Sequence, residues 1–339
     1  MSIKNILLIR LRLLGDIIFT IPTITLLKKN LPNCNIYYIV EDEFEEIGKL
    51  LPNIYKLIVI PRKMGLIKML KLRKKIRSIG FDVLIDLHSG PKSSQISFLS
   101  GIKKKIGYRV PFRSWIYDIK FDRTQKEPYI HSVFNQIRLL EGIGIKTDKK
   151  NIPSYPQAQI NKSNISNQLQ TLLKKEKKIV LHVGAGNSFR DWGTDNYICL
   201  SKRLTEKGYS VFLIGHGKKE IERGKEIEKK VNINNLIGKL SIEESFFLIQ
   251  NSDLYFGVDS GPLHLASLTE TPIVAIYGPN LPEISGPWRK KNVSIVQSDL
   301  KCRPCDQRVC IYKENNDKIK CMKNIEVNDI YETIVKYSK

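Results

Sequence analysis

Short runs of apolar residues alternate with segments of helical periodicity along most of this chain. Four such runs lie in the first half, at residues 3–9, 36–40, 57–60 and 83–87. Near-continuous apolar runs of this length are typical of strands that are covered on both faces, as in parallel sheets. Because a helical segment follows each run, the pattern predicts an α/β protein with a doubly wound parallel sheet.

The same alternation restarts after a stretch rich in turn and charged residues, at 142–156. A length of 339 residues also suits two domains of ordinary size. We therefore predict one domain over residues 1–150 and a second over 151–325. Apolar residues at helical spacing indicate a terminal helix within 326–339. Two α/β halves of this kind predict a ligand cleft between them.

The most informative single stretch covers residues 257–279, which read GVDSGPLHLASLTETPIVAIYGP. It follows the apolar run 254–256, which indicates the end of a buried strand. Pro262 is well placed in the first turn of a short helix, where its missing N–H costs nothing. A second apolar run at 273–277 completes one βαβ unit.

The polar turn of this unit offers a candidate anion site. Asp259, Ser260 and Gly261 precede the helix, and His264 lies in its first turn. Free backbone N–H groups and the helix dipole favour a negative charge there, and His264 adds a further donor. The alternative is a plain N-cap, which is the commoner role of such a turn.

The formal net charge of +22 bears on partners rather than on the fold. Between Arg62 and Arg77 the chain carries eight Lys or Arg residues, apolar residues among them, and no carboxylate. This pattern predicts a basic amphipathic helix, suited to anionic lipid or to nucleic acid, or else a merely solvated face. No uninterrupted run of eighteen apolar residues occurs, and Arg10 and Arg12 interrupt the first apolar stretch, so we expect a cytoplasmic protein without a membrane span or signal peptide.

Four of the six cysteines lie near the end of the sequence, at Cys302, Cys305, Cys310 and Cys321. The first pair forms a CxxC, for which a metal or redox role competes with ordinary structural thiols. The later spacings match neither a zinc ribbon nor a standard finger. A compact thiol-rich loop is the reading that the spacing favours, and the pairing or metal binding of these thiols stays open.

Candidate reactive residues follow the expected strands, at the carboxyl edge where parallel sheets bind ligands. Asp16, after the first strand, is our candidate catalytic carboxylate, unless it only caps the helix that we expect from Ile17. Arg10 and Arg12 flank it and can bind an anionic substrate. His88 and Lys92 follow the fourth strand in the same way.

In the second half, the glycine-rich segment 184–187 and the nearby Arg190 occupy the equivalent edge. Arg190 can neutralise a departing diphosphate, as a bound metal would, or can form an ordinary surface ion pair.

Taken together, these motifs resemble glycosyltransferase family 9, the ADP-heptose:lipopolysaccharide heptosyltransferases. The resemblance covers nearly the whole chain and rests on RLRLLGDIIFTIPTI, DLHSGPKSS, IGYR, HVGAGNSFRDW, GVDSGPLHLASLTETPIVAIYGPNLPEISGPW, and CRPCDQRVC with the later CM. It implies two Rossmann-like domains facing a cleft, the glycosyltransferase B-type fold, with the terminal helix packing back on the first domain.

The resemblance also implies an inverting, metal-independent transfer of heptose from an ADP-activated donor to lipopolysaccharide core or a related glycan. Asp16 matches the family's general base, and Arg190 matches a basic residue, often lysine, near the donor phosphates. The expected donor-binding residues are Gly184, Gly186, Asn187, Asp259, Ser260, Gly261 and His264. The expected acceptor-binding residues are Arg10, Arg12, His88, Lys92 and Arg109. The arginine in place of lysine and the glycine-rich loop leave the donor's base and sugar open.

Two other functions compete with this one. A sugar-nucleotide epimerase shares the fold but needs no carbohydrate acceptor. A nucleic-acid-binding protein is suggested only by charge, and the sequence contains no nucleic-acid-binding motif. We therefore expect an enzyme without cofactor or metal, whose partners are a nucleotide-sugar donor and an anionic glycolipid. We also expect peripheral association with the inner membrane and no nucleic acid.

Overall fold

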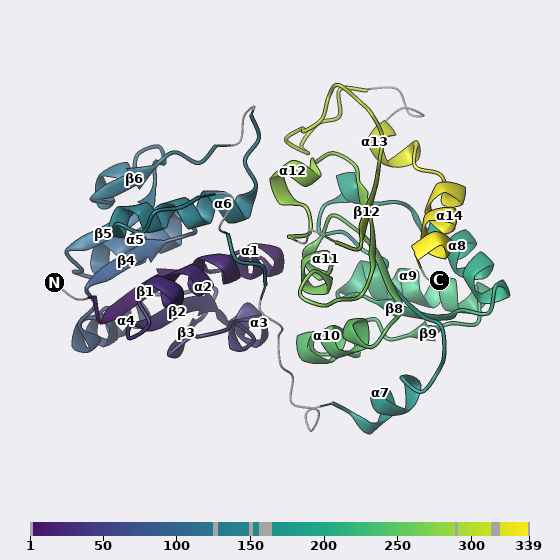
Figure 1. Ribbon diagram of the computed structural model, residues 1–339, viewed down its shortest axis with the longest axis horizontal. Coiled ribbons are helices and arrows are strands. Elements are labelled where there is room, and N and C mark those ends of the chain that lie inside the picture. The colour runs from purple at the N-terminus through teal and green to yellow at the C-terminus, as the bar shows by residue number, and fades with distance from the viewer. Residues whose placement is uncertain are drawn as a thin grey trace. The chain divides into compact units, whose positions relative to one another are not determined.

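The computed structural model describes residues 3–124, 128–148, 152–155, 165–288, 291–312 and 319–337. The chain divides into two compact units, Met1–Pro156 and Gln157–Lys339. The predicted boundary between residues 150 and 151 lies outside the described residues, and the division falls six residues after it. Figure 1 shows one sheet in each unit.

The sheet of the first unit has six parallel strands in the order β3-β2-β1-β4-β5-β6. They are β1 (Asn5–Ile9), β2 (Asn35–Glu41), β3 (Lys56–Ile60), β4 (Val83–Asp86), β5 (Lys104–Tyr108) and β6 (Ile119–Phe121). Strand order reverses beside β1, so the loops after β1 and β4 diverge at the carboxyl edge. The predicted doubly wound sheet is confirmed.

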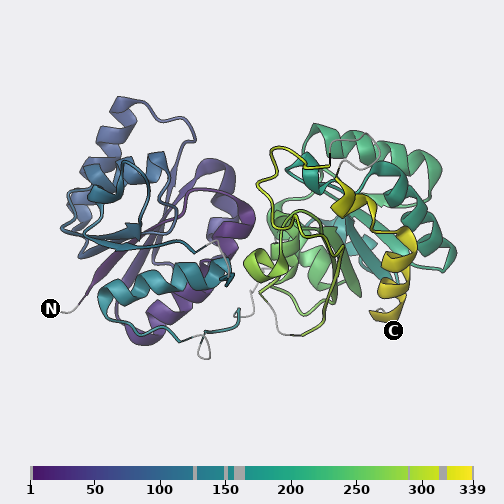
Figure 2. The ribbon, with the colours of Figure 1, turned by 90° about the horizontal axis from the view of Figure 1, so that it is seen from above.

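Helices cover both faces of this sheet, as Figures 1 and 2 show. The α-helices are α1 (Leu14–Ile18), α2 (Ile21–Asn30), α3 (Glu45–Lys49), α4 (Leu66–Ile79), α5 (Pro91–Leu99) and α6 (Ser132–Ile137), and the 3-10 helices are η1 (Asp42–Phe44), η2 (Ser114–Ile116) and η3 (Arg138–Ile143). Met69, Leu72 and Ile76 of α4 and Ile96 of α5 share one core cluster with the strands. These two helices therefore cover the same face of the sheet.

The sheet of the second unit also has six parallel strands, in the order β12-β11-β10-β7-β8-β9. They are β7 (Lys178–His182), β8 (Ser210–Ile214), β9 (Asn234–Asn235), β10 (Leu254–Val258), β11 (Ile273–Tyr277) and β12 (Val293–Gln297). All five residues of β10 and of β11 are buried, which agrees with their continuous apolar sequences.

The α-helices of this unit are α7 (Asn167–Leu172), α8 (Thr194–Glu206), α9 (Lys218–Lys230), α10 (Ile242–Gln250), α11 (Gly261–Ala266), α12 (Pro282–Ser285), α13 (Lys320–Lys323) and α14 (Val327–Tyr337), with a 3-10 turn η6 (Ser188–Arg190). A capping box begins α10, in which Ser241 Oγ accepts from Glu244 N at 3.0 Å and the Glu244 carboxylate accepts from Ser241 N at 3.2 Å. No helix in the described part of the chain has the length and apolar content needed to span a bilayer.

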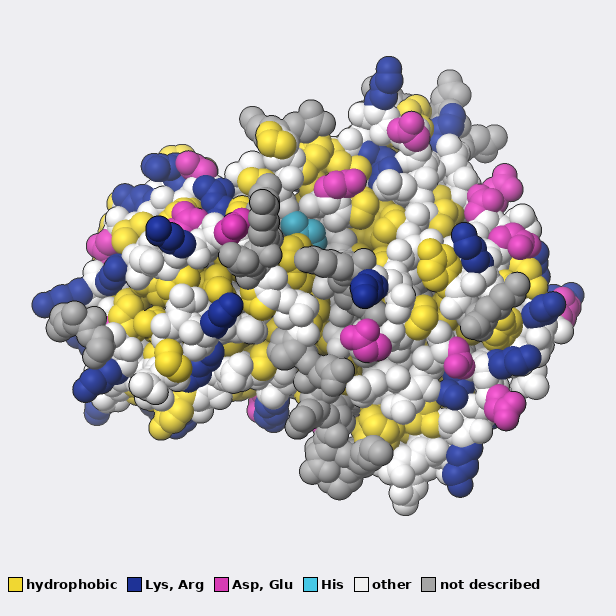
Figure 3. Space-filling view, in the orientation of Figure 1, with side chains coloured by type: hydrophobic (Ala, Val, Ile, Leu, Met, Phe, Trp, Pro, Cys, Tyr) yellow, Lys and Arg dark blue, Asp and Glu magenta, His cyan; other side chains and the backbone are white. Residues whose placement is uncertain are grey.

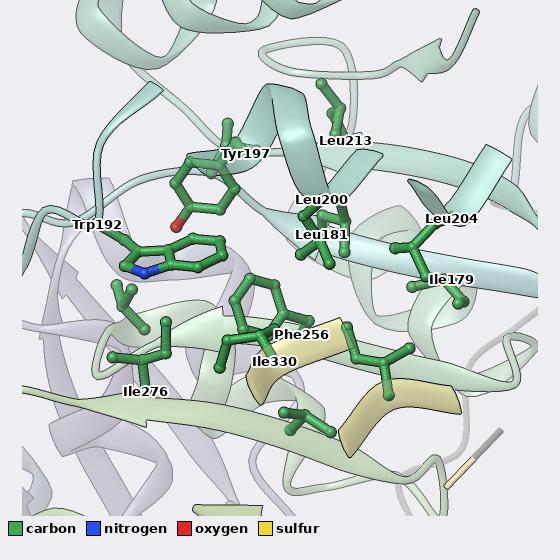
Figure 4. Close-up of a cluster of buried hydrophobic side chains, with 14 of the residues drawn as sticks. Ile179, Leu181, Trp192, Tyr197, Leu200, Leu204, Leu213, Phe256, Ile276 and Ile330 are labelled. Carbon is green, nitrogen blue, oxygen red and sulfur yellow. The ribbon is translucent and has the colours of Figure 1, made fainter. Parts of the chain in front are cut away.

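The terminal helix α14 forms as predicted, and its buried side packs in the second unit, whereas the resemblance implied packing on the first. Ile330 and Ile334 are fully buried in the core of the second unit, in one cluster with Trp192 and Phe256. Figure 4 shows Ile330 beside the Phe256 ring. The Trp192 indole N–H also donates to the carbonyl of Ile325, just before the helix, at 3.0 Å. The helix therefore completes the core of its own unit.

Candidate active site

Asp16 lies at the carboxyl edge of the first sheet, held by a buried arginine. Arg10 is 3% exposed, and its Nη2 forms an ion pair with Asp16 Oδ2. Its Nη1 donates to the carbonyl of Leu87, after β4, at 2.7 Å. Helix α1 begins at Leu14 with Leu13 as its N-cap, so Asp16 does not cap it and that alternative is wrong. Asp16 is a positioned carboxylate.

The turn before Asp16 has an uncommon backbone conformation. Leu13 has a φ of 69°, in the left-handed region that residues other than glycine rarely adopt. The Gln136 side chain donates to the backbone carbonyl of Asp16 at 3.3 Å. The surrounding structure therefore holds this turn in a conformation that is not its local preference, as is common at functional sites.

His88 lies at the same edge and is kept neutral. Burial and the positive charges of Arg10 and Arg12 lower the pKa of His88 to about 4. Its Nδ1 is buried and has no hydrogen-bond partner among the described residues. A neutral imidazole with an unpaired polar nitrogen can exchange a hydrogen bond with a bound hydroxyl.

A buried carboxylate that sequence reasoning overlooked shapes the loop that carries His88. Asp86 accepts from Tyr117 Oη at 2.6 Å, from Ser89 N at 2.7 Å and from His88 N at 2.9 Å. Burial raises the pKa of Asp86, against these hydrogen bonds. The short Asp-Leu-His-Ser turn after an apolar run was the available signal. Asp86 therefore acts on the shape of the site rather than on a ligand.

Arg12, Lys92 and Arg109 are less closely engaged with this group. Arg12 is exposed, near enough to His88 to lower its pKa. Lys92 Nζ pairs with Glu41 Oε1 at 3.0 Å and donates to the carbonyl of Pro61 at 2.7 Å, so it braces the ends of β2 and β3. Arg109 Nε forms an exposed ion pair with Asp122 at 3.0 Å. The structure thus brings together Arg10, Asp16 and His88.

In the second unit, Asp259 at the end of β10 is the centre of a polar cluster. Its buried Oδ2 forms an ion pair with Arg190 Nη1 at 3.1 Å and accepts from Asn280 Nδ2 at 3.1 Å. His264 Nε2 lies 4.0 Å from Oδ1. Because Asp259 is 3% exposed, the surface ion pair considered for Arg190 is not what forms. Asp259 instead holds the side chains of Arg190 and Asn280 in place.

Arg190 is held from a second direction by a residue that the sequence did not single out. Gln307 Oε1 accepts from Arg190 Nε at 2.7 Å, and the carbonyl of Asp259 accepts from Nη1 at 3.0 Å. Nη2 has no acceptor among the described residues. The guanidinium is therefore fixed in place with one edge available to a ligand.

The turn before α11 does not act as a side-chain N-cap. Ser260 is the N-cap residue, but its side chain makes no cap hydrogen bond. Its Oγ instead lies 3.2 Å from His182 Nδ1. Gly261 and Pro262 then begin the helix, and the predicted proline in the first turn is confirmed.

Gly184 is required by a carboxylate from the first turn of α9, the helix that follows β8. A Cβ at Gly184 would lie 1.8 Å from Glu220 Oε1, and one at Gly215 would lie 2.3 Å from Oε2. Glu220 also accepts from His216 N at 2.7 Å and lies 3.6 Å from His182 Nε2. Burial acts to raise the pKa of Glu220, but the hydrogen bonds from His182 and His216 bring it below its usual value.

The remaining predicted donor-side residues serve the backbone or face open space. Asn187 Oδ1 accepts from Phe189 N at 3.0 Å and so caps η6. A Cβ at Gly186 would meet nothing within 4 Å. Sequence reasoning quoted His182 within a motif but missed Glu220, whose only signal was its place after a Gly-His-Gly turn.

The loop that carries Cys302, Cys305 and Cys310, termed the cysteine-rich loop, adjoins this cluster through Gln307. Cys302, Cys305, Cys310 and Cys321 are free thiols that line one small apolar pocket. Burial and the neighbouring thiols raise the pKa of Cys321 to about 11. Within the described ranges, no group of three or more His, Cys, Asp or Glu side chains is arranged to hold a metal ion.

Arg303, between the first two cysteines, ties the loop to the sheet. Its guanidinium donates to the carbonyls of Gly278, Ser298, Tyr277 and Asn280 and to the side chain of Gln297. Asn280 in turn contacts Asp259, and Gln307 of the same loop contacts Arg190. The loop therefore helps to hold the polar cluster in place.

Known proteins share both sequence and architecture with this chain. A lipooligosaccharide heptosyltransferase 2 of Campylobacter jejuni is 26% identical over 333 residues, covering 96% of each chain. The lipopolysaccharide heptosyltransferase 2 of Escherichia coli is 26% identical over 257 residues, covering 71% of this chain and 73% of that protein. The structure of E. coli ADP-heptose lps heptosyltransferase II superposes with a TM-score of 0.81 at 21% identity over 98% of each chain.

A family model confirms the resemblance that the motifs suggested. The model described as glycosyltransferase family 9 (heptosyltransferase) matches residues 69–315, well over half of the chain. That range includes the second unit's polar cluster and most of the cysteine-rich loop. The two six-stranded parallel sheets are also those of the structural relatives, which have the glycosyltransferase B-type fold. This chain is therefore a glycosyltransferase that belongs to family 9, the heptosyltransferase family.

Proposed function

We propose that this enzyme transfers heptose from an ADP-activated donor to lipopolysaccharide core or a related glycan, in one inverting step without a metal. Support comes from the relatives, which are named lipopolysaccharide and lipooligosaccharide heptosyltransferases. One solved relative is described as bound to ADP-2-deoxy-2-fluoro heptose, and 18% identity makes it a guide to fold only. The residues of each unit supply the chemical argument.

The proposal depends above all on the Arg10–Asp16 pair. A sugar hydroxyl is a poor nucleophile at neutral pH, so a positioned base must take its proton during attack. Arg10 binds Asp16 Oδ2, while Oδ1 has no hydrogen-bond partner among the described residues. Asp16 is thus oriented by a buried cation and retains one oxygen that can accept the proton. Arg12 and His88 would bind the acceptor beside it.

Arg190 is proposed to stabilise the departing diphosphate. Negative charge grows on ADP as the sugar–oxygen bond breaks, and preorganised donors lower the energy of that transition state. Arg190 is fixed by Asp259 and Gln307, with Nη2 available. His264 and the N–H groups at the start of α11 add further donors. Attack from the face opposite ADP then inverts the anomeric centre in a single displacement.

This proposal also implies which partners the enzyme has and where in the cell it acts. The acceptor would be an anionic glycolipid at the cytoplasmic face of the inner membrane, and no nucleic acid or cofactor is needed beyond the donor sugar nucleotide. Arg12, Lys92 and Arg109 stay proposed acceptor residues, although Lys92 and Arg109 have carboxylate partners of their own.

The deciding experiment incubates purified protein with ADP-heptose and a lipid A–Kdo acceptor. Mass spectrometry should show a product heavier by one heptose, and NMR of its anomeric proton should show a configuration opposite to the donor's. Activity should survive chelation by EDTA. Asp195, an exposed residue of α8, provides a matched control as Asp195→Asn, which should retain transfer. Free isomerised sugar without a glycosylated product would support an epimerase instead.

A further inference from the structure

One continuous part of the first unit is almost without negative charge. Residues 47–117 contain sixteen Lys or Arg residues but only two carboxylates, Asp82 and Asp86. Asp82 accepts from the backbone N–H groups of Lys4 and Asn5, at 2.7 and 2.9 Å, and Asp86 is fully buried. Asp86 is therefore withdrawn from the surface, and Asp82 is the one exposed carboxylate of the segment. Five of the cations pair with carboxylates outside the segment, namely Lys49, Arg62, Lys92, Lys105 and Arg109, and the rest leave its surface strongly basic.

Helix α4, within this segment, exposes apolar side chains as well as cations. Leu66 and Ile67 are 74% and 72% exposed, and Leu70 is 46% exposed. Residues 66, 67 and 70 share one side of the helix, away from its buried side chains. The helix therefore has two apolar stripes, one in the core and one facing outward among exposed lysines.

A second apolar group lies beside η2. Phe112 is 95% exposed and Trp115 is 66% exposed. The Trp115 indole N–H donates to the carbonyl of Phe112 at 3.2 Å, and its ring meets that of Phe98, at the end of α5, edge to face at 5.3 Å. Three large aromatic rings are therefore held on the surface, close in sequence to Arg109 and Arg113.

The two groups belong to elements that adjoin α5. Helices α4 and α5 cover the same face of the sheet and contact each other, and η2 contacts α5. Figure 3 shows apolar and basic side chains interspersed on the surface of the first unit. Exposed apolar patches of this kind mark interaction sites, and cations with Trp, Phe and Leu side chains are the composition of interfacial membrane anchors.

We propose that this surface, termed the α4–η2 face, binds an anionic phospholipid bilayer, with Phe112 and Trp115 inserted among the headgroups. Its cations match lipid phosphates, whereas its aliphatic and aromatic side chains gain only from an apolar phase. Nucleic acid supplies phosphates but no such phase for Leu66 and Ile67. The choice of a lipid occupant rests on the proposed function, because a lipid-linked acceptor lies in that bilayer.

Vesicle cosedimentation tests the cationic part. The full-length protein should bind vesicles of phosphatidylglycerol and phosphatidylcholine at low salt, and should release as salt is raised. Replacing Lys71, Arg73, Lys74 and Lys75 by Gln should weaken binding by about 10²- to 10³-fold, since each cation contributes about fivefold.

The matched control has the same charge change elsewhere. It replaces the exposed Lys218, Lys219, Lys225 and Lys229 of α9 by Gln and should bind nearly as tightly as the natural protein. Equal weakening by both quadruple variants would mean that net charge alone acts, and the proposal would be wrong. Binding to polyglutamate but not to vesicles would identify an acidic protein as the partner instead.

Tryptophan fluorescence tests insertion. The third tryptophan, Trp288, is partly exposed, so the test uses a Trp288→Phe background. In that background, bromine-labelled phosphatidylcholine in the anionic vesicles should quench Trp115, while Trp192 is buried in its core and stays unquenched. Trp115→Phe should abolish most of the quenching with little change in folding, and Phe112→Ser should lower vesicle affinity. Unchanged quenching in the Trp115 variant, or none in the natural protein, would overturn the proposal. These readouts need no transfer activity, so they stand whether or not ADP-heptose is the donor.

Discussion

The substitution Asp16→Asn separates catalysis from structure most sharply. Asparagine keeps the shape of the side chain but loses the charge that pairs with Arg10. Breaking a fully buried pair costs about 3–5 kcal/mol, and breaking an exposed pair about 1 kcal/mol or less. The Asp16 side chain is 23% exposed, and Arg10 keeps its bond to the Leu87 carbonyl. We therefore expect a loss of about 1–2 kcal/mol in the free energy of unfolding.

The expected loss of activity is larger. A general base contributes about 10²- to 10⁴-fold to a rate, equivalent to roughly 3–5 kcal/mol in the activation barrier. The kcat of Asp16→Asn at saturating donor should fall by that factor, while the affinity for ADP, measured by calorimetry, stays within about twofold. Denaturant unfolding gives the stability term separately.

Two results would refute this reasoning. A kcat within tenfold of the natural enzyme would show that Asp16 is not the base. A parallel loss of ADP affinity and folded protein would show that the Arg10–Asp16 pair serves only the structure.

Other predictions follow from the same contacts. Arg190→Ala and His264→Ala should each raise the activation barrier by about 2–4 kcal/mol at most, with smaller losses in unfolding free energy; normal turnover per folded molecule would contradict this. Gln307→Ala should lower kcat about three- to tenfold by releasing Arg190 Nε, while the exposed Val309→Ala should not, as steady-state kinetics will show. Because the pKa of His88 falls to about 4 on folding, the unfolded chain binds the extra proton, and stability should drop by up to about 3 kcal/mol as pH falls from 6.5 towards 4. Urea titrations of His88→Gln should show a shallower decline, and an identical one would exclude His88 as the source.

The sequence predicted the central strands well because burial on both faces leaves a clear apolar signature. Strands β10 and β11 are entirely buried and were both found. Strand β5 carries Lys104 and Lys105, and β6 has only three residues, so neither gave that signal. Strands near the edge of a sheet bury less apolar surface, so the apolar pattern of their sequences is weaker.

The contact partners of side chains were harder to predict from the sequence than their positions in the fold. The apolar stripe of α14 showed that one side of the helix is buried but not which surface buries it. Lys92 was placed at the correct sheet edge, yet its carboxylate partner is Glu41, fifty-one residues away in the chain. Glu220 was missed because its place depends on Gly184 and Gly215 having no Cβ. Such contacts depend on tertiary structure and leave little trace in a local pattern.

The burial of α14 within its own unit has a consequence for how such enzymes diversify. The core clusters described for each sheet contain residues from that unit alone, and the last helix of the chain returns to the second sheet. Exchanging one half for that of a relative would therefore leave the other half's core side chains in place. Under the proposed function, in which the acceptor binds beside Asp16 in the first unit and the donor beside Arg190 in the second, recombination between family members could change the acceptor while keeping the donor. Laboratory chimeras joined between the units can test the same modularity.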